Sequence, residues 1–320
     1  MICMRIAVLL FFIGSTTCLS SGYAAELSGD LIIFHAGSLA VPFWEIAEAF
    51  MAEHPKVRVR REAAGSRESA RKISDLGRPC DVMASADYLV IDTLLLPEHA
   101  TWNIKFAANQ MSIAYTDRSR YAEALTADNW LDLVMRADVA FGRSDPNTDP
   151  CGYRTLLTAK LAEKHYARPG FAERLAQKDR RFMRPKETDL LALLETGAID
   201  YVFIYRSVAE QHRLRWLALP EEIHLGNADL ADWYASVSVE ISGPEPGTTM
   251  TQPGAPMVYG VTIPTNAPNP EAALAFVAFL LDKDKGLAIM ERNGQPGVVP
   301  SASATYEQVP EALKRFVAAP

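Results

Sequence analysis

Short apolar runs alternate with segments of helical periodicity in the first third of the chain. Residues 31–36 are an apolar run that ends at Gly37, residues 57–59 and 81–84 are further strand candidates, and a helix is expected from Ser66 to Leu76. The segment after Gly37 has apolar residues at helical spacing, namely Phe43, Ile46, Ala47, Phe50 and Met51. Because hairpins cannot produce this alternation, we predict an α/β fold with a parallel sheet and crossover helices.

The same alternation resumes in the middle of the chain. Strands are expected at residues 111–115, 139–141 and 199–205 and, after a loop rich in Gly and Pro, at 257–263. We interpret the strands 111–115 and 257–263 as paired crossings between two lobes. The predicted first lobe comprises residues 27–110 and 257–320, with a helix from Pro270 to Leu281, and the predicted second lobe comprises residues 111–256.

Four short turns each deliver a small or acidic residue to the start of an expected helix, namely Ser38, Ser66, Asp149 and Glu187. Helix N-termini carry unpaired N–H groups and a partial positive charge, so several of them together favour an oxyanion. Ligands of α/β sheets lie beyond the carboxyl ends of the strands, and two of the four residues fall on each predicted lobe. The sequence therefore predicts an oxyanion site in the cleft between the lobes.

Two of these four residues are carboxylates, which repel an ordinary anion. The repulsion becomes an attraction if the central atom of the anion is a metal that accepts further oxygen ligands. Tungstate and molybdate have such a centre, whereas sulfate and phosphate do not. Asp149 and Glu187 are therefore candidate ligands of tungsten or molybdenum.

Each candidate also has a purely structural interpretation. Gly37-Ser38 and Gly65-Ser66 fit ordinary helix caps, and Asp149 followed by Pro150 is a strong helix start by itself. Gly152 in that first turn costs about 1 kcal/mol relative to alanine unless something approaches the backbone closely. A ligand at the turn supplies a reason, with the Cys151 amide donating to an oxo group.

For the remaining candidate residues, the sequence gives weaker evidence of a role in ligand binding. Glu187 and Asp189 both complement a helix dipole, and the sequence hardly distinguishes them. Tyr205 ends the strand expected at 199–205, where its phenol can donate one hydrogen bond to an oxyanion. Arg154 is expected to pair with a nearby acid or carbonyl group.

The chain resembles the tungstate/molybdate-binding proteins of ABC importers, in the branch best known from archaea. The resemblance covers nearly all of the chain after residue 25, and its most specific block is Asp-Pro-Cys-Gly-Tyr-Arg at 149–154. The segments that carry it are residues 35–39, 145–154, 184–187, 207–212 and 293–296. It implies a type II periplasmic-binding-protein fold of two α/β lobes that closes over one oxyanion and presents it to a membrane permease.

The resemblance also implies a ligand set. In that branch the metal is six-coordinate, with four oxo groups and two carboxylates. Gly37, Ser38 and Ser66 would donate from the first lobe, whereas the Cys151 amide and Tyr205 would donate from the second lobe, together with the metal ligands Asp149 and Glu187.

Two departures from the family pattern bear on this ligand set. The stretch between Arg154 and Arg184 is shorter than in archaeal members, and Ile204 stands where the family has an acid. If that acid were the second metal ligand, this chain would have lost six-coordination.

The N-terminus has the features of a secretory signal peptide. Arg5 precedes an apolar run at residues 6–13, and small polar residues follow up to residue 25. The run is about half as long as a membrane span requires. Cys18 offers a lipoprotein alternative, but its flanking residues fit lipid attachment poorly. We therefore expect residues 1–25 to be removed and the protein to be periplasmic or extracytoplasmic.

The charge and the cysteines narrow the remaining possibilities. The net charge is −7, and the sequence contains no basic stripe, which argues against a nucleic-acid partner. No zinc-type spacing occurs among the six histidines. After processing only Cys80 and Cys151 remain, and the sequence leaves open whether they form a disulfide.

The sequence thus predicts a monomeric transport protein without enzymatic activity or a cofactor. Its ligand would be tungstate or molybdate and its partner an ABC permease. The alternative within the same fold is a binding protein for sulfate or another tetrahedral oxyanion. A remote alternative is an exported hydrolase with Asp149 or Glu187 as general base, although no nucleophile motif accompanies these acids.

Overall fold

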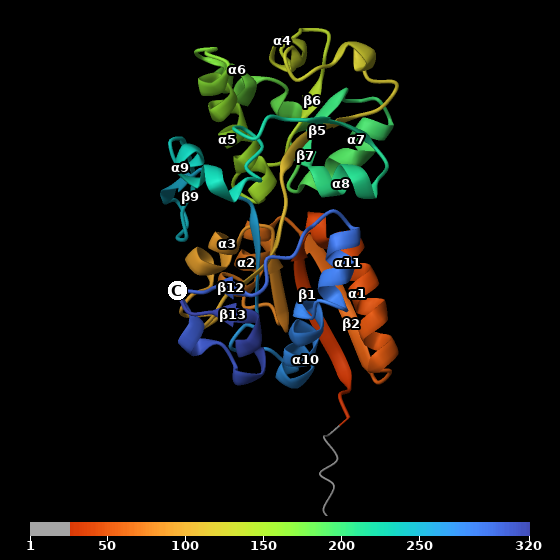
Figure 1. Ribbon diagram of the computed structural model, residues 1–320, viewed down its shortest axis with the longest axis vertical. Helices are drawn as coiled ribbons and strands as arrows, with labels where there is room; N and C mark the ends of the chain where they lie inside the picture. The colour runs from red at the N-terminus through yellow and green to blue at the C-terminus, as the bar shows by residue number, and fades with distance from the viewer. Residues whose placement is uncertain (1–25) are drawn as a thin grey trace, which may run out of the picture.

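The computed structural model describes residues 26–320, which form two α/β lobes stacked end to end (Figure 1). The expected signal peptide and Cys18 lie outside these residues. The lower lobe in Figure 1 contains both the first and the last described segments, and the upper lobe contains the middle of the chain. Within residues 26–320, no helix has the length and apolar character needed to cross a membrane.

A five-stranded sheet of mixed direction forms the centre of the first lobe. Strand β1 (Gly29–Ala36) pairs in parallel with β2 (Val57–Ala64) and β3 (Val82–Ser85). Strand β11 (Val258–Thr262) runs antiparallel to β3 and to β4 (Ile104–Ala108). The predicted strands are confirmed, and the first three pair in parallel as expected, whereas β11 adds two antiparallel pairs that the sequence did not reveal. Strand β4 leads toward the second lobe and β11 returns from it, so these neighbours run in opposite directions.

Helices cover both faces of this sheet (Figure 1). Asn269 caps α10 by accepting a hydrogen bond from the N–H of Ala272 (3.4 Å), and Pro270 occupies the first turn. Phe50 of α1 packs on Phe276 of α10, with ring centroids 5.2 Å apart. The helices are α1 (Ala40–Glu53), α2 (Ser66–Ser74), α3 (Tyr88–Leu94), α10 (Pro270–Leu281) and α11 (Gly286–Arg292). Shorter elements are the 3-10 helices η1 (Gly37–Leu39), η6 (Tyr306–Gln308) and η7 (Glu311–Phe316) and the paired strands β12 (Ser301–Ala302) and β13 (Val317–Ala318).

The second lobe is built on a four-stranded sheet in the order β6-β7-β5-β8. Its strands are β5 (Met111–Tyr115), β6 (Phe141–Gly142), β7 (Tyr201–Tyr205) and β8 (Arg215–Ala218), with β5 antiparallel to both β7 and β8. Its helices are α4 (Trp130–Val134), α5 (Pro150–His165), α6 (Phe171–Gln177), α7 (Leu191–Glu195), α8 (Arg206–Gln211), α9 (Ala231–Tyr234), η2 (Ala122–Ala124), η3 (Arg180–Phe182), η4 (Glu187–Leu190) and η5 (Ala228–Leu230). Strands β9 (Ser238–Ser242) and β10 (Thr249–Pro253) form a separate hairpin.

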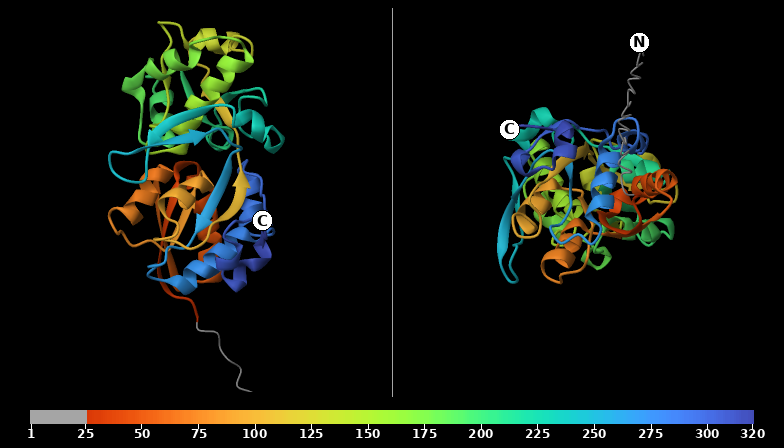
Figure 2. Two further views of the ribbon diagram at one scale, coloured as in Figure 1. Left: turned by 90° about the vertical axis from the view of Figure 1, so that its left-hand side faces the viewer. Right: turned by 90° about the horizontal axis from the view of Figure 1, so that it is seen from below.

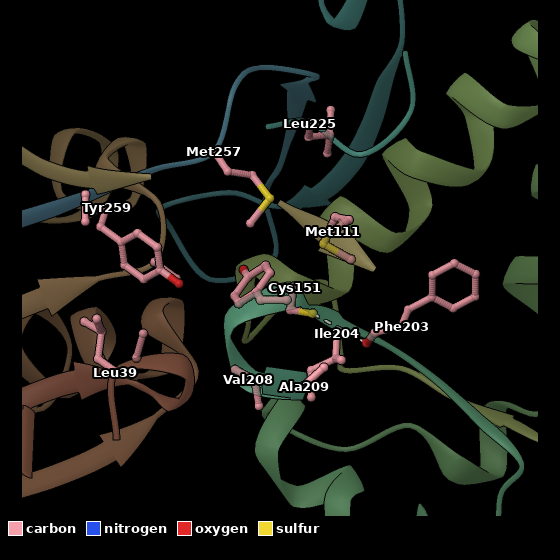
Figure 3. Packing of buried hydrophobic residues seen from close by; sticks show 14 of the residues in the cluster. Leu39, Met111, Cys151, Phe203, Ile204, Val208, Ala209, Leu225, Met257 and Tyr259 are labelled. Atoms are coloured by element: carbon pink, nitrogen blue, oxygen red, sulfur yellow. Dashed lines mark hydrogen bonds between the residues drawn. The ribbon is translucent and has the colours of Figure 1, made fainter. Parts of the chain in front are cut away.

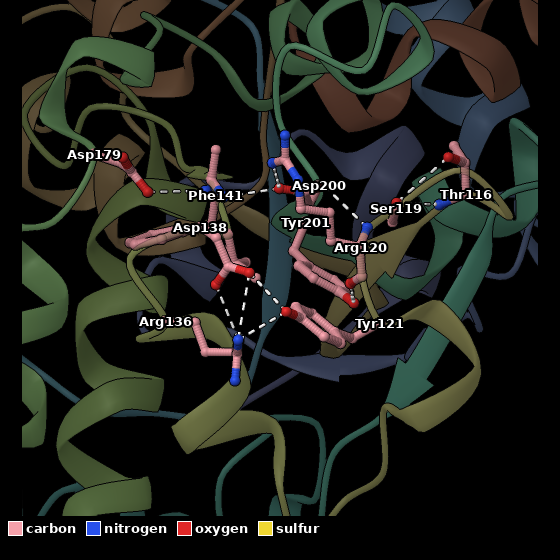
Figure 4. Close-up of polar contacts among 12 residues, drawn as sticks. Thr116, Ser119, Arg120, Tyr121, Arg136, Asp138, Phe141, Asp179, Asp200 and Tyr201 are labelled. Carbon is pink, nitrogen blue, oxygen red and sulfur yellow. Dashed lines mark hydrogen bonds and ion pairs between the residues drawn. The ribbon is translucent and has the colours of Figure 1, made fainter.

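A buried acid anchors the start of β7 to the loops around it (Figure 4). The carboxylate of Asp200 accepts hydrogen bonds from the N–H groups of Arg120 (3.0 Å) and Ala140 (2.8 Å) and also pairs with the Arg120 guanidinium. These contacts tie the start of β7 to the two loops that carry Arg120 and Ala140.

The chain crosses between the lobes in the short links before β5 and before β11. Strand β5 pairs within the second sheet and β11 within the first, so each of these two strands begins directly after one crossing and neither spans the junction. Strand β4, which the pattern did not reveal, is the partner of β11, and the two lie side by side below the junction (Figure 2, left). Such short double links suit a hinge between rigid lobes.

The two described cysteines lie far from each other in the fold. Cys80 precedes β3 in the first lobe, whereas Cys151 lies in α5 of the second lobe, and both are buried free thiols. Burial raises the pKa of Cys80 to about 12. The disulfide that the sequence left open is therefore not formed.

Candidate functional site

Glu187 is the most unusual side chain between the lobes. It begins η4 and is 1% exposed, yet neither carboxylate oxygen has a hydrogen-bond partner among residues 26–320. A Cβ atom on Gly37 of the first lobe would lie 2.9 Å from one of these oxygens. Buried polar atoms are normally paired, so the carboxylate of Glu187 is a candidate ligand-binding group.

The structure separates Glu187 from its neighbour Asp189. The side chain of Asp189 is 37% exposed and pairs with Lys186 at 3.3 Å. Glu187 instead lies against Gly37 of the first lobe, where the absence of a side chain gives it room. The sequence did not distinguish Glu187 from Asp189. In the structure they differ because Glu187 lies on the side of η4 that faces the first lobe.

Asp149 lies against Glu187 and begins α5. Its Oδ1 accepts a hydrogen bond from the N–H of Cys151 (3.3 Å) and its Oδ2 accepts one from the N–H of Glu187 (2.9 Å). Asp149 is 1% exposed, and Pro150 follows it at the first helical position, as the sequence indicates. The cap thus fixes the carboxylate beside Glu187. The Cys151 amide, which we predicted to donate to a ligand, donates to Asp149 in this structure.

Asp149 and Glu187 form a buried pair, and within residues 26–320 neither acid has an ion pair with a cationic side chain. Burial raises the pKa of Asp149 above its usual value. Burial, and then the charge of Asp149, raises the pKa of Glu187 well above its usual range. A positively charged centre between these carboxylates would relieve both effects.

Gly152 has a structural explanation that the sequence did not reveal. A Cβ atom there would lie 2.5 Å from the backbone carbon of Asp145 and 2.6 Å from the carbonyl oxygen of Ser144. The turn before Asp149 therefore packs directly on α5. The interpretation that a ligand requires this glycine was wrong, because the chain's own backbone fills the space.

Serines of the first lobe face the same region. Ser38 lies in η1 and is 1% exposed, and its Oγ accepts a hydrogen bond from the Tyr259 hydroxyl (2.9 Å). Ser66 is fully buried at the start of α2, where its Oγ accepts a hydrogen bond from the N–H of Ala86 (2.9 Å). In both contacts the serine is the acceptor, so each hydroxyl hydrogen remains available to a ligand.

Arg154 joins the two lobes and also holds Tyr205. The guanidinium of Arg154 donates to the Tyr205 hydroxyl (3.0 Å) and to the carbonyl of Ala86 (2.7 Å), and it pairs with Asp87 at 3.2 Å. Arg154 was expected to pair with a nearby acid or carbonyl group, and it pairs with one of each, but both partners belong to the first lobe and are distant in sequence. Burial raises the pKa of Tyr205 well above its usual value, so its phenol stays a hydrogen-bond donor.

Ile204 occupies the position where the family resemblance led us to expect an acid. It is fully buried in β7 and belongs to the apolar cluster at the junction, which also includes Met111, Cys151 and Val208 (Figure 3). An acid here would require a polar partner that this cluster does not provide. Position 204 therefore supplies no carboxylate, and Asp149 and Glu187 remain the candidate pair.

The lobes meet in close backbone contact beside Ser66. The carbonyl oxygen of Thr148 accepts hydrogen bonds from the N–H groups of Arg67 and Glu68, both at 3.1 Å. These donors begin α2, so this helix end is occupied by the second lobe rather than left open. A Cβ atom on Gly65 would lie 2.4 Å from the same Thr148 oxygen. The closed arrangement of the lobes thus depends on glycine at residue 65.

Replacing Gly65 with alanine is expected to hinder closure. The added methyl group would collide with backbone atoms of the second lobe, while each lobe keeps its own core. We expect an affinity loss for oxyanion of at least about tenfold, which corresponds to about 1.4 kcal/mol. Titration calorimetry measures it, with Gly297→Ala as the control because a Cβ there meets only ordinary contacts from 3.4 Å. An unchanged affinity in the Gly65 variant would show that binding does not need this contact.

The fold and the buried polar site between two lobes define the class of two-lobe solute-binding proteins. The chain belongs to the family of bacterial extracellular solute-binding proteins, whose match covers residues 31–295. The predicted family resemblance is thereby confirmed.

Two relatives and one solved structure illustrate this similarity. The chain is 50% identical over 295 residues to an uncharacterised solute-binding protein of Petrotoga mobilis, covering 92% of each chain. It is 39% identical over 341 residues to the molybdate/tungstate-binding protein WtpA of Pyrococcus abyssi, covering 98% of this chain and 96% of the relative. The periplasmic molybdate-binding protein of Azotobacter vinelandii superposes with a TM-score of 0.61 at 14% identity, covering 83% of this chain and 98% of that one. This last likeness shows the fold alone and confirms the predicted two-lobe architecture.

Proposed function

We propose that the protein captures tungstate or molybdate between its lobes and delivers it to an ABC importer, without catalytic turnover. The observation that carries this proposal is the buried pair Asp149 and Glu187, with both Glu187 oxygens lacking a partner among the described residues. An anion that accepts carboxylate oxygens must offer an electrophilic centre. The molybdate/tungstate-binding relative supports the same ligand class.

The number of carboxylates also supports a metal oxyanion. Metal ions in proteins are commonly held by three or more protein ligands. Tungstate and molybdate bring four oxo groups of their own, so two carboxylates suffice to complete six-coordination. Asp149 and Glu187 would contact the metal in this arrangement.

Neutral donors would bind the oxo groups. The hydroxyl groups of Ser38 and Ser66 and the backbone at Gly37 would come from the first lobe, and the phenol of Tyr205 and the Cys151 amide from the second. The Cys151 amide would have to share its hydrogen with Asp149. Closure would replace the hydration shell of the anion with these fixed donors and present the closed monomer to a permease.

Parallel calorimetric titration of the protein with tungstate, molybdate and sulfate tests this function. We expect tight binding of the first two and at least about 1,000-fold weaker binding of sulfate, a difference of about 4.1 kcal/mol. Tungstate at 100 times its dissociation constant should also stabilise the fold by about 2.7 kcal/mol, which a rise in melting temperature reports. Comparable binding of sulfate would indicate a site of hydrogen bonds alone and would contradict metal coordination.

A further inference from the structure

A buried network of five polar side chains connects Ser38 to the link between the lobes. The Tyr259 hydroxyl lies at its centre, 2.9 Å from Ser38 Oγ, 2.8 Å from Asn109 Nδ2 and 3.2 Å from Gln295 Nε2. Asn109 Nδ2 also donates to Ser207 Oγ at 2.7 Å. All five residues are buried, and the most exposed of them, Asn109, is 6% exposed, so water has little access to the network.

Backbone groups fix the direction of the hydrogen bonds in this network. The N–H of Gln110 donates to Asn109 Oδ1 (2.9 Å), so the other end of the Asn109 amide must be the donor. The carbonyl oxygen of Ser38 accepts from Gln295 Nε2 (2.9 Å), which orients the Gln295 amide in the same way. Both amides therefore present N–H groups to the Tyr259 oxygen.

The hydroxyl hydrogen of Tyr259 then has one available acceptor in this network, Ser38 Oγ. The Tyr259 oxygen accepts from the Asn109 and Gln295 amides, and neither of these N–H groups can accept the phenol hydrogen. Tyr259 must therefore donate its own hydrogen to Ser38 Oγ. Because Ser38 Oγ accepts from Tyr259, its own hydroxyl hydrogen is available to another partner. Ser38 directly follows Gly37, which lies against Glu187.

We propose that Tyr259 is a positioning residue that fixes Ser38 as a hydrogen-bond donor to the bound oxyanion. This inference rests on the proposed function, because it assigns the ligand to the Ser38 hydroxyl. Asn109 lies in the link between β4 and β5 and contacts Ser207 at the start of α8. The network thereby ties the orientation of Ser38 to the relative placement of the lobes.

A double-mutant cycle with tungstate titrated by calorimetry tests this role. Ser38→Ala should weaken binding between about fivefold and 150-fold through the lost hydrogen bond. Tyr259→Phe keeps the ring and should weaken binding by about tenfold in the wild-type background, since Ser38 then loses its fixed orientation. In the Ser38→Ala background the same substitution should change affinity by less than about twofold, because there is no hydroxyl left to orient.

A matched control and a second variant keep the test decisive. Tyr234→Phe removes another buried phenol, whose hydroxyl contacts Glu221 outside the site, and should leave tungstate affinity unchanged. If Tyr259→Phe does not fold, Gln295→Met removes a donor to Tyr259 and should show the same dependence on Ser38.

The outcomes distinguish the inference from the function on which it rests. Equal affinity losses from Tyr259→Phe in both backgrounds, in a wild-type protein that binds tungstate, contradict the positioning role alone. A wild-type protein that binds neither tungstate nor molybdate contradicts the proposed function and this inference together. A loss that vanishes in the Ser38→Ala background supports both.

Discussion

Glu187→Gln is expected to lower tungstate affinity by at least about 100-fold, or about 2.7 kcal/mol, while raising the stability of the ligand-free protein at pH 7. The amide has nearly the same shape as the carboxylate, so the cleft is preserved. It is a far weaker ligand for a metal centre, which accounts for the lost affinity. It also carries no charge into a buried position beside Asp149, which accounts for the gained stability.

The raised pKa of Glu187 also predicts how the stability difference between Glu187→Gln and the wild type changes with pH. The pKa of Glu187 is raised in the folded protein by burial and by Asp149, so folding favours its protonated form. Protonated Glu187 contributes favourably to the free energy of unfolding. This contribution is fully present below pH 4.5, the usual pKa of the side chain, and is lost as the pH rises toward the pKa of Glu187 in the folded protein. The stability advantage of Glu187→Gln should therefore grow with pH above about 4.5.

Thermal unfolding between pH 4 and pH 8, together with calorimetric titration at pH 7, measures both effects. The matched control is Asp189→Asn, which changes a partly exposed acid paired with Lys186 in the same short helix. That variant should keep wild-type affinity. A folded Glu187→Gln protein with unchanged tungstate affinity would exclude Glu187 as a metal ligand.

Asp149 is expected to show a different combination of effects, because it is both a helix cap and a candidate ligand. Asp149→Ala removes the acceptor for the N–H groups of Cys151 and Glu187 and should destabilise the fold by about 0.5–2 kcal/mol. Asp149→Asn retains one acceptor oxygen and should cost less. Both variants should lose tungstate affinity by about 100-fold or more, since both lack the anionic ligand.

Comparison of the two Asp149 variants separates capping from coordination. Chemical denaturation measures the free energy of unfolding, and titration calorimetry measures the affinity. If Asp149→Asn bound tungstate like the wild type, Asp149 would be only a cap. Both variants are needed, because Asp149→Ala alone would not separate a lower free energy of unfolding from a lower tungstate affinity.

The sequence predicted those parts of the site that local signals encode. Asp149 with Pro150, and the glycine before Ser38, are signals carried by neighbouring residues, and the structure places these residues at the starts of α5 and η1. Glu187 could not be separated from Asp189, because the dipole argument applies equally to both. Which acid is buried depends on the first lobe packing over η4, and this is a contact between distant segments.

Contacts between distant segments also explain the features that the sequence missed. Tyr259, Asn109 and Gln295 converge from β11, from the link after β4 and from the end of α11, and no local pattern relates them. The family resemblance included Gln295 in one matching segment, which was the single available signal. The antiparallel direction of β11 was missed for the same reason, since it follows from the return of the chain from the second lobe.

X-ray absorption at the tungsten L3 edge of the protein–tungstate complex tests most directly whether Asp149 and Glu187 coordinate the metal. Free tungstate has four oxygen neighbours, and the proposed site adds two carboxylate oxygens. We predict a six-coordinate spectrum for the wild-type complex and a lower coordination number for Glu187→Gln. A wild-type complex in which tungsten keeps only its four oxo neighbours would contradict coordination by the two acids and would leave hydrogen bonds as the basis of recognition.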